Sequence, residues 1–154
     1  MFLPAVLVLG GAVAFTVFYK SGGGGVEFYP DDPAVVAEGQ AVYQANCASC
    51  HGAKLEGQAN WQSVKADGKL PAPPHDVSGH TWHHANSLLF GMTKFGPAKY
   101  IGDDYKSDMP AFENVLSDKE IIAVLSYIKS QWPVDVQRSH DQINREYIQN
   151  NGNE

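Results

Sequence analysis

Two cysteines and a histidine lie close together in the segment Cys47-Ala48-Ser49-Cys50-His51. Thiols separated by two residues lie on one side of a turn, where they could add to the two vinyl groups of one porphyrin. The next residue could then offer its imidazole to the iron. C-x-x-C-H is the motif by which haem is attached covalently to a protein chain. The spacing therefore predicts one covalent haem c held by Cys47 and Cys50, with His51 as proximal iron ligand.

Two other uses of this cysteine pair fit the sequence less well. These are the only two cysteines in the chain, and a structural disulfide across a two-residue gap would be a poor one. A thioredoxin-like redox pair needs a strand–helix–strand context, which the pattern of this sequence does not contain. The haem interpretation is therefore the one that the rest of the chain has to support.

A haem iron with one histidine needs a second axial ligand, or it stays open to small molecules. Met109 lies in Ser107-Asp108-Met109-Pro110, at the end of a polar loop. Pro110 has no N–H and a fixed φ, so the loop is stiff there, which suits a thioether that must reach iron. Met92 lies in an apolar stretch and is expected to pack in the core. Met109 is therefore the candidate for the second ligand.

The C-x-x-C-H motif after a first helix, the later S-D-M-P motif and a final helix after LSDKE resemble class I cytochromes c. The resemblance covers residues 33–133 and implies an all-α fold wrapped around one haem. In that family a methionine at the place of Met109 is the axial ligand. The first and last helices cross at a small residue and aromatic side chains, which here would be Gly39 and Tyr43 against Tyr127.

Other residues are assigned by the resemblance alone. A proline carbonyl after the haem motif usually accepts the Nδ1–H of the proximal histidine, which fixes its tautomer. Pro73 or Pro74 would supply that carbonyl here, and Pro74 is taken as the haem-binding candidate.

Four histidines occur in the ten residues from His75 to His84. One interpretation places His80 and Trp82 at the haem propionates, where N–H donors meet carboxylates. A second is a separate metal site, and a third is a solvated loop that covers the haem edge. The sequence leaves all three open.

Helices at three places would position these residues. Asp32 as N-cap and Pro33 predict a helix over residues 33–46 that runs into the haem motif. Residues 86–95 resemble a short helix, and a capping box at Ser117 and Glu120 begins a last clear helix that Pro133 ends. Residues 52–78 and 96–108 are expected to be loops.

The N-terminal residues 2–19 carry no charge, and eighteen helical residues would span about 27 Å, close to the hydrocarbon thickness of a bilayer. We expect residues 1–20 to form a single transmembrane anchor in the lipid bilayer and residues 21–30 a Gly-rich linker. The haem domain would occupy residues 31–133 and a polar tail residues 134–154, which could be a helix lying on a partner or a frayed end. A cleaved signal peptide is the alternative to the anchor, because Ala12-Val13-Ala14 matches a cleavage site.

The formal net charge of −6, from 17 acidic and 11 basic residues, argues against nucleic acid as a partner. Haem attachment outside the cytoplasm would place the domain in the periplasm, on a bacterial inner membrane. The resemblance implies an electron carrier and not an enzyme, with no small-molecule substrate. Its partners would be a quinol-cytochrome c oxidoreductase or another cytochrome, and a terminal oxidase or photosynthetic reaction centre.

Two questions stay open at this stage. The carrier could be a tethered shuttle in a respiratory or photosynthetic chain, or a fixed subunit of one membrane complex. If Met109 were not a ligand, the open iron would instead suit a haem sensor or a peroxidase-like enzyme.

Overall fold

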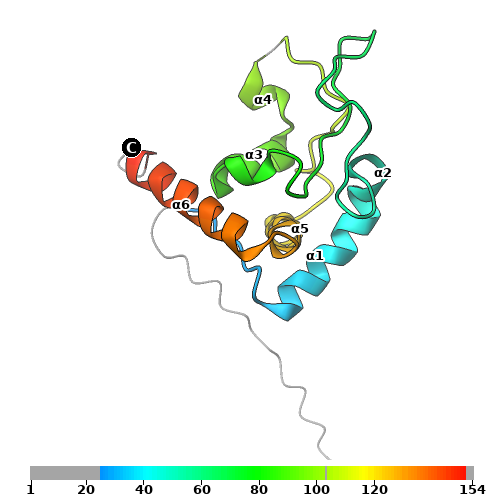
Figure 1. The fold of residues 1–154 in the computed structure, drawn as a ribbon. Coiled ribbons are helices and arrows are strands. Elements are labelled where there is room, and N and C mark those ends of the chain that lie inside the picture. The colour runs from blue at the N-terminus through cyan, green and yellow to red at the C-terminus, as the bar shows by residue number, and fades with distance from the viewer. Residues whose placement is uncertain (1–24, 103, 152–154) are drawn as a thin grey trace, which may run out of the picture.

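The structure is a computed structural model that describes residues 25–102 and 104–151 of the 154-residue chain (Figure 1). The predicted anchor at residues 1–20 and residues 21–24 of the predicted linker lie outside this part. Among the helices that the structure does describe, none combines the length and the apolar character needed to cross a bilayer.

All regular secondary structure in these two ranges is helical, in agreement with the predicted all-α fold. The elements are α1 (Pro33–Asn46), α2 (Ala48–His51), the 3-10 helix η1 (Thr81–His83), α3 (Asn86–Phe95), α4 (Ala98–Ile101), α5 (Asp118–Ser130) and α6 (Val134–Asn151).

The caps that begin α1 and α5 are those that the sequence predicts. The Asp32 carboxylate accepts hydrogen bonds from the backbone N–H groups of Ala34 and Val35, at 2.9 and 3.2 Å. At the start of α5, the Glu120 carboxylate accepts the backbone N–H of Ser117 at 2.8 Å, and the Ser117 hydroxyl accepts the N–H of Glu120 at 3.3 Å. Each cap satisfies backbone donors that a helix start leaves without a partner.

The crossing of α1 over α5 forms the centre of the fold, and Figure 1 shows α5 nearly end-on where α1 passes it. A Cβ atom on Gly39 would lie 2.0 Å from the Ala123 carbonyl oxygen, so only glycine lets the two helices approach this closely. One turn further along α1, the rings of Tyr43 and Tyr127 meet with their centroids 5.5 Å apart. The predicted crossing of Gly39 and Tyr43 against Tyr127 is confirmed.

The second half of the predicted linker differs from a flexible spacer. Phe28 is buried, and the backbone N–H of Tyr29 donates to the Ser126 hydroxyl on α5 at 2.9 Å. The carbonyl of Val26 accepts a 2.8 Å hydrogen bond from the Asn86 side chain at the start of α3. The physical reason is the apolar Val26 and Phe28, which follow the glycines and supply surface to bury. We call residues 25–30 the N-terminal arm.

A short helix, α4, interrupts the segment 96–108, which the sequence predicts as a loop. Pro97 precedes it and Gly102, with φ of 133°, follows it, so a helix starter and a helix breaker enclose a single turn. The Tyr100 ring on α4 reaches the α3 backbone at Gly91, where an added Cβ would lie 1.9 Å from the phenolic oxygen. The turn thereby packs against α3.

The polar tail contains α6, which lies against its own domain. His140 is fully buried there, and Lys129 of α5, itself only 5 % exposed, forms an ion pair with Asp141. A helix that spans nearly the whole of residues 134–154 thus replaces the frayed end that was one expectation.

Candidate haem-binding site

The two cysteines lie in the turn where α1 passes into α2. Cys47 is the C-cap of α1 and the N-cap of α2, and its carbonyl accepts the N–H groups of Cys50 at 3.1 Å and of His51 at 2.9 Å. Cys50 is exposed and Cys47 is half-buried, and both are free thiols. Burial raises the pKa of the Cys47 thiol to about 11, with Cys50 adding to the shift. A thiol that stays protonated is unlike the low-pKa thiolate of a redox-active pair.

His51 is buried and oriented by one hydrogen bond. Its Nδ1 donates to the carbonyl of Pro73 at 2.8 Å, so Nε2 carries the lone pair that an iron ligand needs. Burial lowers the pKa of His51, which the Pro73 bond partly opposes. The imidazole is therefore held neutral, in the form that binds metal.

The acceptor is Pro73 and not Pro74, so the choice of Pro74 as the haem-site proline is wrong. The Pro74 carbonyl faces Gly79, on which a Cβ would lie only 2.0 Å from that oxygen. Pro74 still shapes the site, because its backbone packs against Gly57, where a Cβ would lie 2.5 Å from the Pro74 nitrogen. With φ of 68°, Gly57 adopts the left-handed conformation and leaves room for the proline segment to reach His51.

The loop that carries Met109 is held by a hydrogen bond within the loop, by packing against the core and by hydrogen bonds to α3. The N–H of Met109 donates to the Ser107 hydroxyl at 3.0 Å, and its half-buried side chain packs against the core. After it, the N–H of Phe112 donates to the Thr93 and Lys94 carbonyls of α3, at 3.2 and 3.0 Å.

Asp108 holds the same loop from the other side. Its carboxylate pairs with Lys65, at 3.0 Å, and with Lys69. Hydrogen bonds from the two lysines, with Lys69 first, hold the pKa of Asp108 below its usual range. Sequence reasoning missed this cluster, because the three residues come from two loops whose relative placement no local pattern reports. Met92, by comparison, lies half-buried on α3.

The family model for cytochrome c matches residues 36–132. The chain belongs to the cytochrome c family. The match extends from the first turn of α1 to just beyond the end of α5 and includes the two cysteines, His51 and Met109. Cytochromes of this family bind haem c covalently and carry electrons, and a single domain of this kind holds one haem. No solved structure matches the chain.

The segment after Pro74 contains a feature that suits a haem in this cytochrome. The indole Nε1–H of Trp82 is buried without a hydrogen-bond partner among the residues that the structure describes. A buried donor without an acceptor is costly, and a haem propionate would supply the acceptor. The Trp82 ring stacks on His83, with centroids 3.6 Å apart. These residues therefore fit the group that the family binds.

His80 is placed differently from Trp82. It is exposed, its ring stacks on Trp61 at 5.4 Å, and the ring of His84 lies edge-on to it, also at 5.4 Å. The expected pairing of His80 with Trp82 at the propionates is therefore supported for Trp82 alone. Within the two described ranges, no group of three or more histidine, cysteine or acidic side chains could hold a metal ion, so the separate metal site has no support.

His75 is a site residue that sequence reasoning did not assign. Its ring stacks on His51 with centroids 4.0 Å apart and planes inclined by 22°. Its Nδ1 lies 2.8 Å from the Thr81 hydroxyl, and its carbonyl accepts the Trp132 indole N–H at 2.7 Å. Burial, and after it the neighbouring His51, lower the pKa of His75 well below its ordinary value. The signal in the sequence that could have found His75 is its position directly after Pro73 and Pro74, the two candidates for the carbonyl that binds His51.

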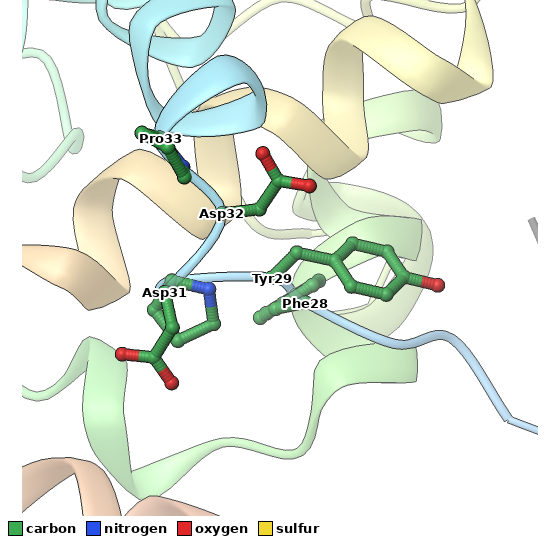
Figure 2. A pocket seen from close by; sticks show the side chains of 6 residues that line it. Phe28, Tyr29, Asp31, Asp32 and Pro33 are labelled. Atoms are coloured by element: carbon green, nitrogen blue, oxygen red, sulfur yellow. The ribbon is translucent and has the colours of Figure 1, made fainter. Parts of the chain in front are cut away.

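A surface hollow lies at a distance from this site along the chain. Figure 2 shows that it is lined by the consecutive residues 28–33, in the turn that leads from the N-terminal arm into α1. None of the cysteine, histidine or methionine side chains of the haem site lines it.

Proposed function

We propose that this cytochrome c is a one-electron carrier with a six-coordinate haem, attached to a bacterial inner membrane with its haem domain in the periplasm. The observation that carries the proposal is the turn of Cys47, Cys50 and His51, in which the Pro73 carbonyl fixes the histidine. Cys47 and Cys50 would hold the haem through thioether bonds. His51 and Met109 would be its axial ligands.

Methionine as the sixth ligand favours the ferrous state and raises the reduction potential. With both axial positions taken, the iron has no place for a substrate, so the protein would act as a carrier and not as an enzyme. Trp82 would donate its indole N–H to a propionate. His80, at the exposed edge of the same segment, would lie outside this bond.

The partners follow from the proposed location. Electrons would come from a quinol-cytochrome c oxidoreductase or another cytochrome and pass to a terminal oxidase or a photosynthetic reaction centre. The cytochrome would work either as a tethered shuttle or as a fixed subunit of such a complex.

The test of the ligand assignment is a pair of matched methionine variants. Met109→Ala should abolish the weak far-red band that arises from sulfur bound to ferric iron, and it should open the reduced iron to carbon monoxide. Met92→Ala should keep the band and leave carbon monoxide without effect. The assignment is wrong if the two variants exchange these outcomes.

Carbon monoxide binding to the unsubstituted protein distinguishes the electron carrier from the alternative, a haem sensor or peroxidase-like enzyme. A sensor or peroxidase-like enzyme with open iron would bind carbon monoxide before any substitution is made. We expect carbon monoxide to leave the spectrum of the reduced parent nearly unchanged.

A further inference from the structure

Helix α6 lies beyond the region that the cytochrome c family model matches, which ends at residue 132. It nevertheless packs on η1, which carries Trp82. Figure 1 shows it beside the start of α3 and close to the end of α5. A helix of 18 residues outside the matched region is therefore packed onto the segment that carries Trp82, the candidate donor to a haem propionate.

His140 is the buried anchor of α6. Its Nε2 lies 3.0 Å from the carbonyl of His84, so Nε2 carries the proton and donates. The ring stacks on Phe28 of the N-terminal arm, with planes 10° apart, and lies edge-on to Trp132 at 5.2 Å. The His140 side chain thus contacts His84, Phe28 of the N-terminal arm and Trp132, which follows α5.

Asn144, one turn further along α6, supplies the cap that α3 lacks. The α3 N-cap residue is Ala85, which has no side chain that could accept a hydrogen bond. The Asn144 side-chain oxygen accepts the backbone N–H of Asn86 instead, at 3.1 Å. The side-chain amide of Asn86 in turn donates to the carbonyl of Val26 in the N-terminal arm, so Asn86 joins α6, α3 and the arm.

The segment 75–86 is consequently held at both ends. Trp132 binds the carbonyl of His75 at its beginning, and His140 and Asn144 bind His84 and Asn86 at its end. Between these points, the buried indole N–H of Trp82 has no partner among the described residues. The contacts at the two ends of the segment fix its backbone, and this backbone sets the direction of the Trp82 indole N–H.

We propose that α6 is a clamp that holds the segment 75–86 in the haem-binding position, with His140 and Asn144 as positioning residues that act through Trp82. The clamp rests on the contacts just described, and only its effect on the haem rests on the proposed function. Truncating a partly exposed asparagine is less disruptive than opening the buried contacts of His140, so Asn144 is the better residue to test.

Hydrogen exchange in the haem-loaded full chain tests the clamp directly. Asn144→Ala should accelerate exchange of the Asn86 amide and its neighbours in the segment 75–86 at least tenfold, while α1 and α5 keep their protection. Asn144→Asp keeps an acceptor at the start of a helix, where a negative charge is favourable, and should restore protection. Asn150→Ala, on the exposed end of α6, is the matched control and should change nothing.

Two exchange results would overturn the clamp. One is unchanged protection of the segment in Asn144→Ala, and the other is equal acceleration throughout the domain, which would mean general destabilisation.

The reduction potential tests whether the clamp acts through Trp82. Trp82→Phe should lower the potential, because an unpaired propionate charge favours ferric iron. Asn144→Ala should lower it in the same direction, Asn144→Asp should restore it, and the double variant should not fall below Trp82→Phe alone. The positioning role would be overturned if the shifts of the two single variants added up in the double variant, or if Asn144→Ala had the same potential as the parent protein. The far-red band, which tests the proposed iron ligands, should stay unchanged in all these variants. Failure of the clamp and failure of the ligand assignment can therefore be told apart.

Discussion

Gly39 is the residue on which the approach of α1 to α5 depends. On an exposed helix face, glycine-to-alanine substitution stabilises by about 1 kcal/mol through helix propensity. At Gly39 the sign should reverse, because the new methyl would lie 2.0 Å from the Ala123 carbonyl and 2.9 Å from the Tyr127 Cβ. We expect Gly39→Ala to lower the free energy of unfolding by about 1–3 kcal/mol, the range for overpacked cores. Urea unfolding measures it.

Ala41, on the exposed side of the same helix, provides the control. Ala41→Gly removes a methyl group from α1 and should cost about 1 kcal/mol through propensity alone. A Gly39→Ala protein that is more stable than the parent would show that the two helices can separate at little cost.

Single residues also mark the limit of what the sequence could predict at the site. The cysteines, His51 and Met109 are set by local motifs, and the structure places the first three in one turn. The choice between Pro73 and Pro74 depends on which carbonyl faces His51, and that direction is fixed by the close packing of Gly57 and Gly79. A contact between loops leaves no periodic pattern in the chain.

At the scale of elements, the caps explain why helix bounds were predictable. Asp32 and Ser117 report the starts of α1 and α5 because a cap is a local interaction over three or four residues. The place of α6 was not predictable, because its contacts to His84, Asn86 and Phe28 join residues far apart in sequence. The same holds for the pairing of Asp108 with Lys65 and Lys69.

The packing of α6 should make the domain sensitive to acid. Burial, with Lys129 adding to it and the His84 carbonyl and Asp141 opposing it, lowers the pKa of His140 from 6.5 to about 4. Between these two values the unfolded chain binds a proton that the folded chain refuses, so stability falls as the pH drops from 6.5 towards 4. The loss attributable to His140 is roughly 2–3 kcal/mol.

Urea unfolding at pH 7 and pH 4.5 measures this dependence. His140→Phe keeps a ring between Phe28 and Trp132 and removes the titrating group, so its stability should change less between the two pH values than that of the parent. Phe28→Leu loosens the same packing but keeps the histidine, and it should retain the steep acid dependence. An equal pH dependence in His140→Phe and the parent would assign the acid sensitivity to other groups.

At the scale of the whole molecule, the proposed anchor predicts how the protein divides between the membrane and the soluble fraction. The uncharged residues 2–19 should keep the full chain in the membrane pellet after alkaline carbonate washing, which removes peripheral proteins. A chain that begins at residue 21, exported by a cleavable signal, should be soluble and should still bind haem, because the arm and the helices that enclose the site remain. Release of the full chain by carbonate, or a mature N-terminus at Phe15, would contradict the anchor.

The packed N-terminal arm limits how far the haem domain can travel from such an anchor. Ten free residues, 21–30, would extend to roughly 33–36 Å, whereas residues 21–24 alone reach at most roughly 13–14 Å. Phe28 and the hydrogen bonds of Val26 and Tyr29 remove the other six from the tether. The volume within reach of the domain shrinks with the cube of that length, by more than tenfold. An electron acceptor would therefore have to present its docking site no farther from the membrane surface than this short tether and the width of the haem domain allow. A partner whose site stands higher would be out of range however well its surface matched.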